Sequence, residues 1–145
     1  MTRMLLAAVA ALFLLPAWAG DAAPIGQDAL LERMTSGQGD LLVLDVRSAK
    51  EFAEGHVPGA VNISHEELAA RLPEIEAERE GDVVVYCRSG RRAEIALDLL
   101  AKAGFERLYH LEGDYLAWSA ADRPVETPAQ PVLPPAVGVE SPAVP

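Results

Sequence analysis

A cysteine followed by three arginines is the clearest candidate for chemistry in this chain. Cys87 is the only cysteine among 145 residues, and Arg88, Arg91 and Arg92 follow it within five positions. Fixed positive charges near a thiol favour the thiolate, which is the nucleophilic form of sulfur. These residue types therefore predict a nucleophilic sulfur in an anion-attracting site. The alternative is an inert cysteine that packs in the core like a small apolar side chain.

The residues around Cys87 also predict a loop that can hold an anion. The apolar run 83–86 is typical of a strand buried on both faces, and residues 92–103 have helical apolar spacing, so Cys87 lies at a strand-to-helix junction. Open α/β sheets place ligand sites at such strand ends. If the loop curls, the amides of residues 88–93 and the positive end of the helix face the sulfur. We therefore predict that Cys87 is catalytic and that the substrate-binding residues are Arg88, Ser89, Gly90, Arg91 and Arg92. For each arginine, contact with solvent or with loop carbonyls is an alternative to substrate contact.

The elements that must position this loop alternate between strand-like and helix-like patterns. This alternation predicts an α/β domain with a parallel sheet covered by helices. Strands are expected at 41–46, 60–63, 83–86 and 107–111, and helices at 25–35, 65–72, 92–103 and 115–119. Ser64 and Glu67 predict a capping box for the second helix, Pro73 its end, and Gly104 the left-handed end of the third.

The other polar residues predict structural roles. We expect Asp45, Arg47 and Glu51 to form hydrogen bonds and ion pairs that fix neighbouring loops. His56 lies in a turn and is expected to bond backbone, and the spacing of His65 and His110 contains no metal motif. Phe105 and Trp118 are expected in the core.

Composition limits the classes of function. With 50% apolar and 23% charged residues, the chain is long enough for one domain with a real core. Its 12 basic residues against 22 acidic ones give a net charge of -10, which argues against nucleic-acid binding. One cysteine excludes an internal disulfide, and three histidines supply few metal ligands, so we expect no metal and no cofactor.

The two ends differ from the middle of the chain. Residues 1–19 have the pattern of a signal peptide: Arg3, an apolar run at 4–15 and a small-x-small site ending at Ala19. A run of this length is too short to span a membrane, which needs about 20 residues. We expect export, a periplasmic location and a soluble mature protein without stable membrane insertion. Residues 127–145 are rich in proline, which predicts a disordered tail, with a docking ligand for a partner as the alternative.

Three segments together resemble the rhodanese, or thiosulfate sulfurtransferase, domains. They are LLVLDVRSAKEFAEGHVPGAVNIS at 41–64, VVVYCRSGRRA at 83–93 and AGFERLYHLEGDYLAW at 103–118. The resemblance covers residues 25–126 and implies five parallel strands with helices on both faces. It also implies that Cys87 takes sulfane sulfur from a donor such as thiosulfate, becomes a persulfide held by the loop amides, and passes the sulfur to cyanide or a thiol. We expect a monomer that binds a small sulfur-containing anion as its substrate.

Two other functions stay open on the sequence. One is a non-catalytic binding module that uses this fold to recruit a partner. The other is a cysteine phosphatase, because related folds hold phosphate in a similar loop. Phosphatase loops have five residues between cysteine and arginine, whereas four separate Cys87 from Arg92. The smaller ring suits one sulfur atom better than a phosphate group.

One position departs from the family pattern. The family usually has two glycines after Leu-Glu, and the second of these is Asp114 here. We expect Asp114 to cap the final helix at 115–119. The alternative is that it lies at the mouth of the site and repels anionic donors.

Overall fold

The apolar runs of the sequence form a five-stranded parallel sheet in the computed structural model, which describes residues 22–37 and 39–128. The strand order is β1-β5-β4-β2-β3 and every pairing is parallel. The bounds are Ala23–Ile25 (β1), Leu41–Asp45 (β2), Val61–Asn62 (β3), Asp82–Tyr86 (β4) and Arg107–Leu111 (β5). The expected signal segment 1–19 and positions 129–145 of the expected tail lie outside the described residues.

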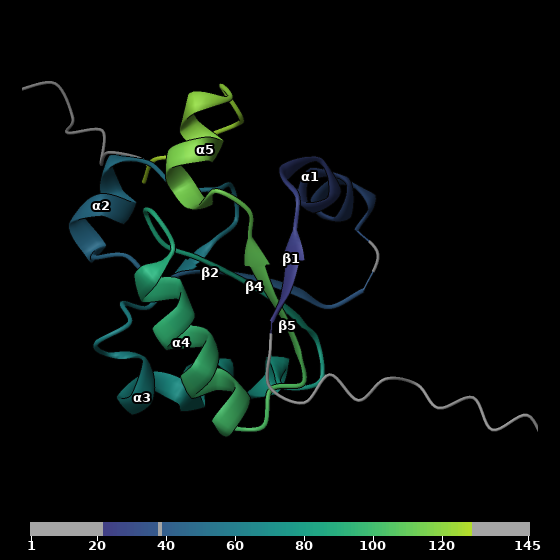
Figure 1. Ribbon diagram of the computed structural model, residues 1–145, viewed down its shortest axis with the longest axis vertical. Helices are drawn as coiled ribbons and strands as arrows, with labels where there is room; N and C mark the ends of the chain where they lie inside the picture. The colour runs from purple at the N-terminus through teal and green to yellow at the C-terminus, as the bar shows by residue number, and fades with distance from the viewer. Residues whose placement is uncertain (1–21, 38, 129–145) are drawn as a thin grey trace, which may run out of the picture.

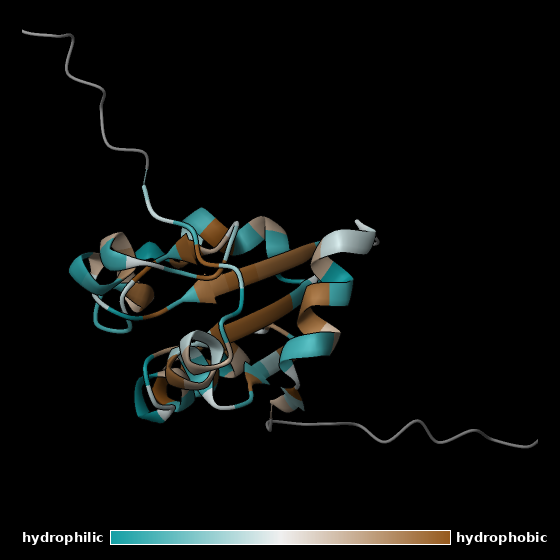
Figure 2. Cartoon of the chain, turned by 90° about the horizontal axis from the view of Figure 1, so that it is seen from above, coloured by the Kyte–Doolittle hydropathy of each residue, from teal (hydrophilic) through white to brown (hydrophobic). Residues whose placement is uncertain are grey.

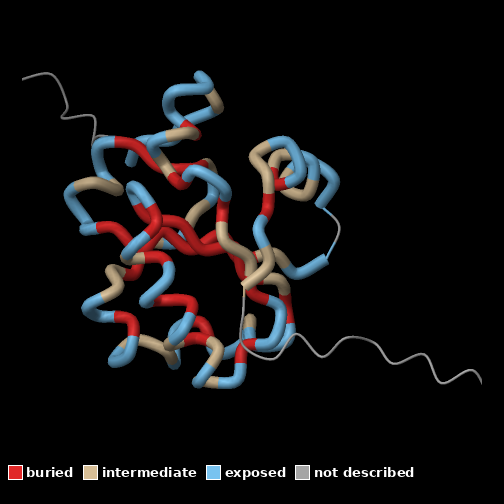
Figure 3. The backbone as a smooth tube through the Cα atoms, in the orientation of Figure 1, coloured by how far each residue is buried: buried red, intermediate tan, exposed pale blue. Residues whose placement is uncertain are grey.

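The two central strands explain why their sequences are continuously apolar. β2 and β4 pair along their whole length, with Val43 opposite Val84. Both side chains pack on one face of the sheet, while Leu44 and Val85 pack on the other. Figure 2 shows the strands as the hydrophobic centre of the molecule, and Figure 3 shows the same segments as buried. Burial on both faces explains why positions 41–44 and 83–85 are all apolar.

Helices cover both faces of the sheet, as the resemblance implied. The described residues form six helices, which are α1 (Gln27–Ser36), α2 (Ala49–Glu54), α3 (Leu68–Arg71), the 3-10 helix η1 (Leu72–Glu78), α4 (Arg91–Lys102) and α5 (Asp114–Ala120). α3, η1 and α4 pack on one face and α1 and α5 on the other, which can be followed in Figure 1. The strand ends that carry the candidate site therefore lie between two helical layers.

The helix after the cysteine loop matches its sequence pattern closely. α4 buries the predicted face, which consists of Ala93, Ala96, Leu97 and Leu100. Its end is a Schellman motif, in which the Phe105 N–H donates to the Leu100 carbonyl (3.1 Å) and Gly104 has a φ of 92°. Gly104 can adopt this left-handed conformation without strain.

Two elements at the start of the domain differ from the prediction. Residue 25 belongs to a strand rather than a helix, because Ala23–Ile25 pairs with Tyr109–Leu111 and α1 begins only at Gln27. The short helix α2 was not predicted. A capping box begins it, since Ser48 and Glu51 exchange side-chain and backbone hydrogen bonds.

The predicted capping box at Ser64 is wrong. The Ser64 hydroxyl donates to the Glu67 carboxylate (3.0 Å) instead of accepting an amide, and α3 begins only at Leu68. The Glu67 and Leu68 amides both donate to the Ser64 carbonyl, so the chain makes a turn there. The α-helix does end just before Pro73, as predicted, because α3 ends at Arg71. Pro73 lies in the first turn of the 3-10 helix η1, where a missing N–H costs nothing.

A segment after α5 closes the domain. The Trp118 indole N–H donates to the Pro124 carbonyl (2.8 Å), and the amides and carbonyls of His56 and Glu126 exchange hydrogen bonds of 2.9 Å. Trp118 and Phe105 are buried in the core, as predicted. Among the described residues, no helix combines the length and the apolar character required to span a membrane.

Candidate active site

Cys87 lies directly after β4, at the carboxyl edge of the sheet, and only 1% of the residue is exposed. The Gly90 N–H donates to the Cys87 sulfur at 3.0 Å. Gly90 immediately precedes α4 and has a φ of 119°, which a residue with a side chain rarely adopts. The loop thus curls so that one of the expected amides, followed by the positive end of a helix, is directed at the sulfur.

The peptide of Cys87 is held on both sides by the start of α5. The Cys87 N–H donates to Asp114 Oδ1 (2.9 Å), and the Cys87 carbonyl accepts from the Tyr115 N–H (3.0 Å). The Leu116 N–H donates to the Arg88 carbonyl (3.1 Å). The first amides of a helix have no partner within that helix, so the loop carbonyls satisfy α5 while α5 fixes the loop.

Arg92 bonds a carboxylate from α2. Its two terminal nitrogens donate to the two Glu51 oxygens at 2.8 and 2.9 Å. Hydrogen bonding to Arg92 is the largest cause that lowers the pKa of Glu51 to about 2, and the bond to Glu51 is the largest that raises the pKa of Arg92. The expected structural role of Glu51 is confirmed. The guanidinium of Arg92 bonds this side chain, and the carbonyls of the loop are not its partners.

Arg88 and Arg91 differ from Arg92 because they face solvent. Both residues are exposed, as is Ser89, and neither arginine forms an ion pair with any of the residues 22–37 and 39–128. They create a local positive charge next to the sulfur on an acidic protein.

A buried ion pair fixes the neighbouring strand end. The Arg47 guanidinium donates to Asp45 Oδ2 and to the Gly55 carbonyl, both at 2.7 Å, and the Tyr86 hydroxyl donates to the same carboxylate oxygen at 2.7 Å. Burial by itself would lower the pKa of Arg47, but the hydrogen bond and charge of Asp45 leave it raised. The structural roles predicted for Asp45 and Arg47 are confirmed.

The histidine of the turn also acts as predicted. His56 Nδ1 lies 2.9 Å from the Phe52 carbonyl, and the two rings stack with centroids 3.5 Å apart. No group of three or more histidine, cysteine, aspartate or glutamate side chains in the described part of the chain could hold a metal ion.

The predicted cap at Asp114 is wrong. Gly113 precedes α5, and the Asp114 carboxylate bonds the Cys87 amide and His110 Nε2, which lies 3.1 Å from both oxygens. Asp114 is 3% exposed, so it does not line an open mouth either. Its hydrogen bond to His110 is the largest cause that raises the pKa of that histidine. The sequence analysis did not predict this contact with the cysteine peptide. The signal for it was the aspartate at a position where the family usually has glycine.

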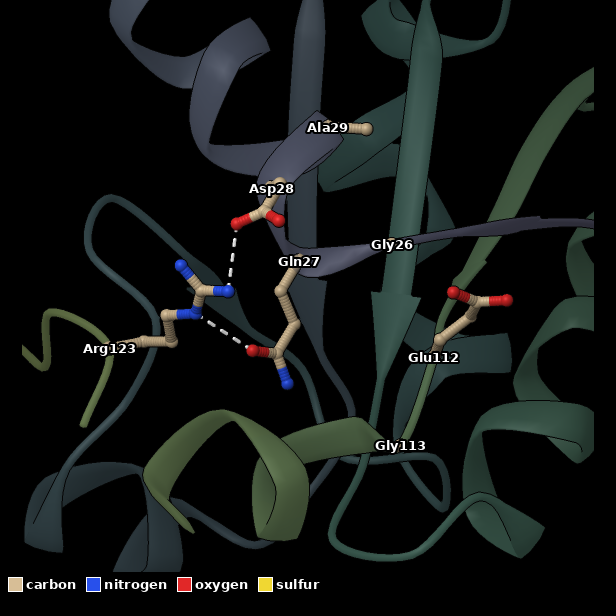
Figure 4. Close-up of a pocket in the computed structure, with 7 residues that line it drawn as sticks. All are labelled: Gly26, Gln27, Asp28, Ala29, Glu112, Gly113 and Arg123. Atoms are coloured by element: carbon tan, nitrogen blue, oxygen red, sulfur yellow. Dashed lines mark hydrogen bonds and ion pairs between the residues drawn. The ribbon is translucent and has the colours of Figure 1, made fainter. Parts of the chain in front are cut away.

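A pocket lies beside this site, between the start of α1 and the turn after β5. Figure 4 shows the Arg123 side chain extending to the start of α1, where it contacts Asp28 (2.8 Å) and Gln27 (2.9 Å). The Glu112 carboxylate points away from Arg123. The pocket lining contains no residue of the loop 87–92. Because its arginine already has two partners, we assign it no substrate.

Comparisons with known proteins point to one family. The model of the "Rhodanese-like domain" family matches residues 27–121. A protein named Sulfurtransferase from Allochromatium vinosum is 34% identical over 104 residues, which cover 72% of this chain and 94% of that protein. Thiosulfate sulfurtransferase GlpE from Shewanella oneidensis is 32% identical over 92 residues, covering 63% and 88%. The NMR structure of the rhodanese-like domain of the Anabaena sp. Alr3790 protein is 28% identical with a TM-score of 0.65, covering 86% of this chain and 93% of that one.

Proposed function

Since this chain belongs to the rhodanese-like domain family and has sulfurtransferases among its relatives, we propose that it transfers sulfane sulfur through a persulfide on Cys87. The observation that carries the proposal is the Gly90 N–H directed at the Cys87 sulfur from the start of α4. A sulfur that receives a backbone donor beside a helix N-terminus is suited to bear negative charge.

The proposed reaction has two displacements at sulfur. The Cys87 thiolate attacks the outer sulfur of thiosulfate, forming a new S–S bond while the old one breaks, and sulfite leaves with the bonding electron pair. Cyanide or a thiolate then attacks the outer sulfur of the persulfide, giving thiocyanate or a new persulfide and returning the Cys87 thiolate. Neither step requires an external oxidant or reductant.

The loop suits the intermediate as well as the free thiolate. The first N–H groups of α4 belong to the turn that has no helical carbonyl partners. They are donors for the outer sulfur of a persulfide anion, which extends beyond the sulfur bonded by Gly90. Arg88 and Arg91 attract the anionic donor at the surface of the same loop.

The decisive experiment is the intact mass of the reduced, purified protein before and after thiosulfate. We expect a gain of one sulfur atom that cyanide removes, and no gain in Cys87→Ser. A reduced wild-type protein that gains nothing from thiosulfate or from other sulfane-sulfur donors would contradict the proposal. Measuring mass tests the first step without assuming the acceptor.

The two exposed arginines are tested by kinetics. Arg88→Ala and Arg91→Ala should each raise the KM for thiosulfate several-fold because they weaken anion binding. Arg107→Ala is the matched control, since it removes the same charge from an exposed position at the opposite end of β5. An equal rise in KM for all three variants would indicate general electrostatics rather than contact at the loop.

The phosphatase and binding-module alternatives have separate readouts. Hydrolysis of p-nitrophenyl phosphate that depends on Cys87 would favour a phosphatase. Partner capture that requires residues 127–145 and tolerates Cys87→Ser would favour a binding module.

The proposal includes export to the periplasm on the basis of residues 1–19. Expression of the full chain in a bacterium should give a periplasmic protein that begins at Gly20. Recovery of the uncleaved chain in the cytoplasm would contradict export and leave the sulfur chemistry unaffected.

A further inference from the structure

Asp114 occupies a backbone position at which a glycine would avoid strain. Its φ is 52°, in the left-handed region, and it is one of two described residues other than glycine with a positive φ. Aspartate tolerates this conformation better than most residues but at a cost. The side chain that results is buried, and its hydrogen-bond partners are the Cys87 amide and His110. Backbone strain is often found at functional sites. Because Asp114 is strained, buried and bonded to the peptide of the proposed nucleophile, we consider it as part of the site.

His110 and Asp114 lie directly against the cysteine loop. A β-carbon on Gly90 would be 3.2 Å from Asp114 Oδ2 and 3.7 Å from His110 Cε1. The N–H of the same glycine bonds the Cys87 sulfur. The sulfur and the carboxylate-imidazole pair therefore contact one shared residue.

This proximity creates an electrostatic problem for an anionic sulfur. A carboxylate a few ångströms away in a site with little water disfavours a second negative charge. Arg92 on α4 is the cation that interacts with the sulfur itself, whereas a positive charge on His110 cancels that of Asp114. The other acid facing His110 is Glu94 on α4, and its flanking partners in β1 and β4 are Pro24 and Val85, which do not titrate.

We propose that Asp114 positions the Cys87 peptide and that protonated His110 prevents this carboxylate from destabilising the anionic sulfur. The inference rests on the proposed function only in requiring that Cys87 work as an anion. Asp114 and His110 are thus positioning residues, and less of the sulfur is anionic at a given pH when His110 is neutral than when it is protonated.

The test is a pH titration of the thiolate by its ultraviolet absorbance, with Cys87→Ser as the background. The variants are His110→Gln, Asp114→Asn and the double variant. Asp114→Asn retains an oxygen for the Cys87 amide and removes only the charge. The readout is independent of sulfur transfer, so it succeeds or fails separately from the mass experiment.

We expect His110→Gln to decrease the thiolate fraction near neutral pH about tenfold, because the carboxylate becomes unbalanced. Adding Asp114→Asn should restore the fraction towards that of the wild type. If each substitution only disturbed the structure, the double variant would lose more thiolate than either single variant. An unchanged thiolate fraction in His110→Gln, or no rescue in the double variant, overturns the proposal.

A second measurement avoids variants of the pair. Linkage requires that an anionic sulfur coupled to His110 also change the titration of His110. We expect the NMR titration midpoint of His110 to be lower in Cys87→Ser than in the reduced wild-type protein. Coincident midpoints would overturn the proposal even if His110→Gln does not fold.

Discussion

Two buried carboxylates flank the strand that leads to the cysteine. Asp45 ends β2 and Asp114 follows β5, and these two strands are the neighbours of β4. Their exposures are 0% and 3%. The cation paired with Asp45 is Arg47, whereas the cation paired with Asp114 is His110.

The two pairs differ in whether the charge of the cation changes with pH. An arginine remains charged at every pH at which the protein folds, so the Asp45 pair is constant. A histidine titrates near neutral pH, so the balance on the Asp114 side changes. The constant pair fixes Tyr86 and the loop at Gly55, and the variable pair holds the Cys87 peptide. A charge that can change is thus placed against the candidate nucleophile.

Removing the permanent cation should have the largest effect. Arg47→Met leaves Asp45 buried without its cation, and we expect it to lower the free energy of unfolding by about 3–5 kcal/mol. Urea denaturation at neutral pH measures the loss. Arg88→Met, at an exposed position, is the control and should change stability by about 0.5 kcal/mol or less. Similar values for the two variants would mean that the Asp45 pair contributes no more than a surface charge.

Removing one neutral donor from Asp45 should have a smaller effect. Tyr86→Phe deletes the hydroxyl that donates to Asp45 and accepts from the Val57 N–H (3.1 Å), so Asp45 loses one of its donors and the buried Val57 N–H loses its partner. We expect a loss of about 1–3 kcal/mol, measured in the same way. Tyr109→Phe is the matched control, since no hydrogen bond of the Tyr109 hydroxyl is found within the described residues. Equal losses would contradict a role for the Tyr86 hydroxyl.

A methyl group at Gly90 tests how tightly the loop packs on the other pair. Gly90→Ala combines a φ of 119° with a contact of 3.2 Å to Asp114 Oδ2, and we expect a loss of about 1–2 kcal/mol. Gly59→Ala has a φ of 74° and no neighbour within 4 Å of the new carbon, so it measures the cost of the backbone conformation without a steric contact. Chemical denaturation should rank Gly90→Ala as the more destabilising. The reverse order would show that Asp114 does not restrict the loop.

The smallest expected effect is a change with pH in the stability that each pair contributes. The folded pKa of His110 is raised by Asp114, so its stabilising contribution is complete below about pH 6.5, the unfolded value. That contribution decreases as the pH rises through the folded value. The stability gap between wild type and His110→Gln should therefore narrow from pH 6 to 8, while the gap for Arg47→Met stays constant. Parallel gaps would remove the distinction between the pairs.

The sequence alone determined the central strands, the face of α4 and the position of Cys87 between them. These features follow from local patterns: a continuous apolar run has to be buried on both faces, and Ala93, Ala96, Leu97 and Leu100 share a face at helical spacing. The cysteine at the end of such a run therefore lies at the carboxyl edge of the sheet.

The hydrogen-bond partners of the polar side chains depend on the three-dimensional packing of the elements. β1 exists because Ala23–Ile25 finds β5, and Glu51 meets Arg92 across 41 positions of sequence. Asp114 could have capped its own helix, but the packing of α5 against the loop brings it to the amide of Cys87, 27 positions earlier. Local patterns specify which residues are buried. The hydrogen-bond partner of a buried carboxylate depends on which strand ends the fold places side by side.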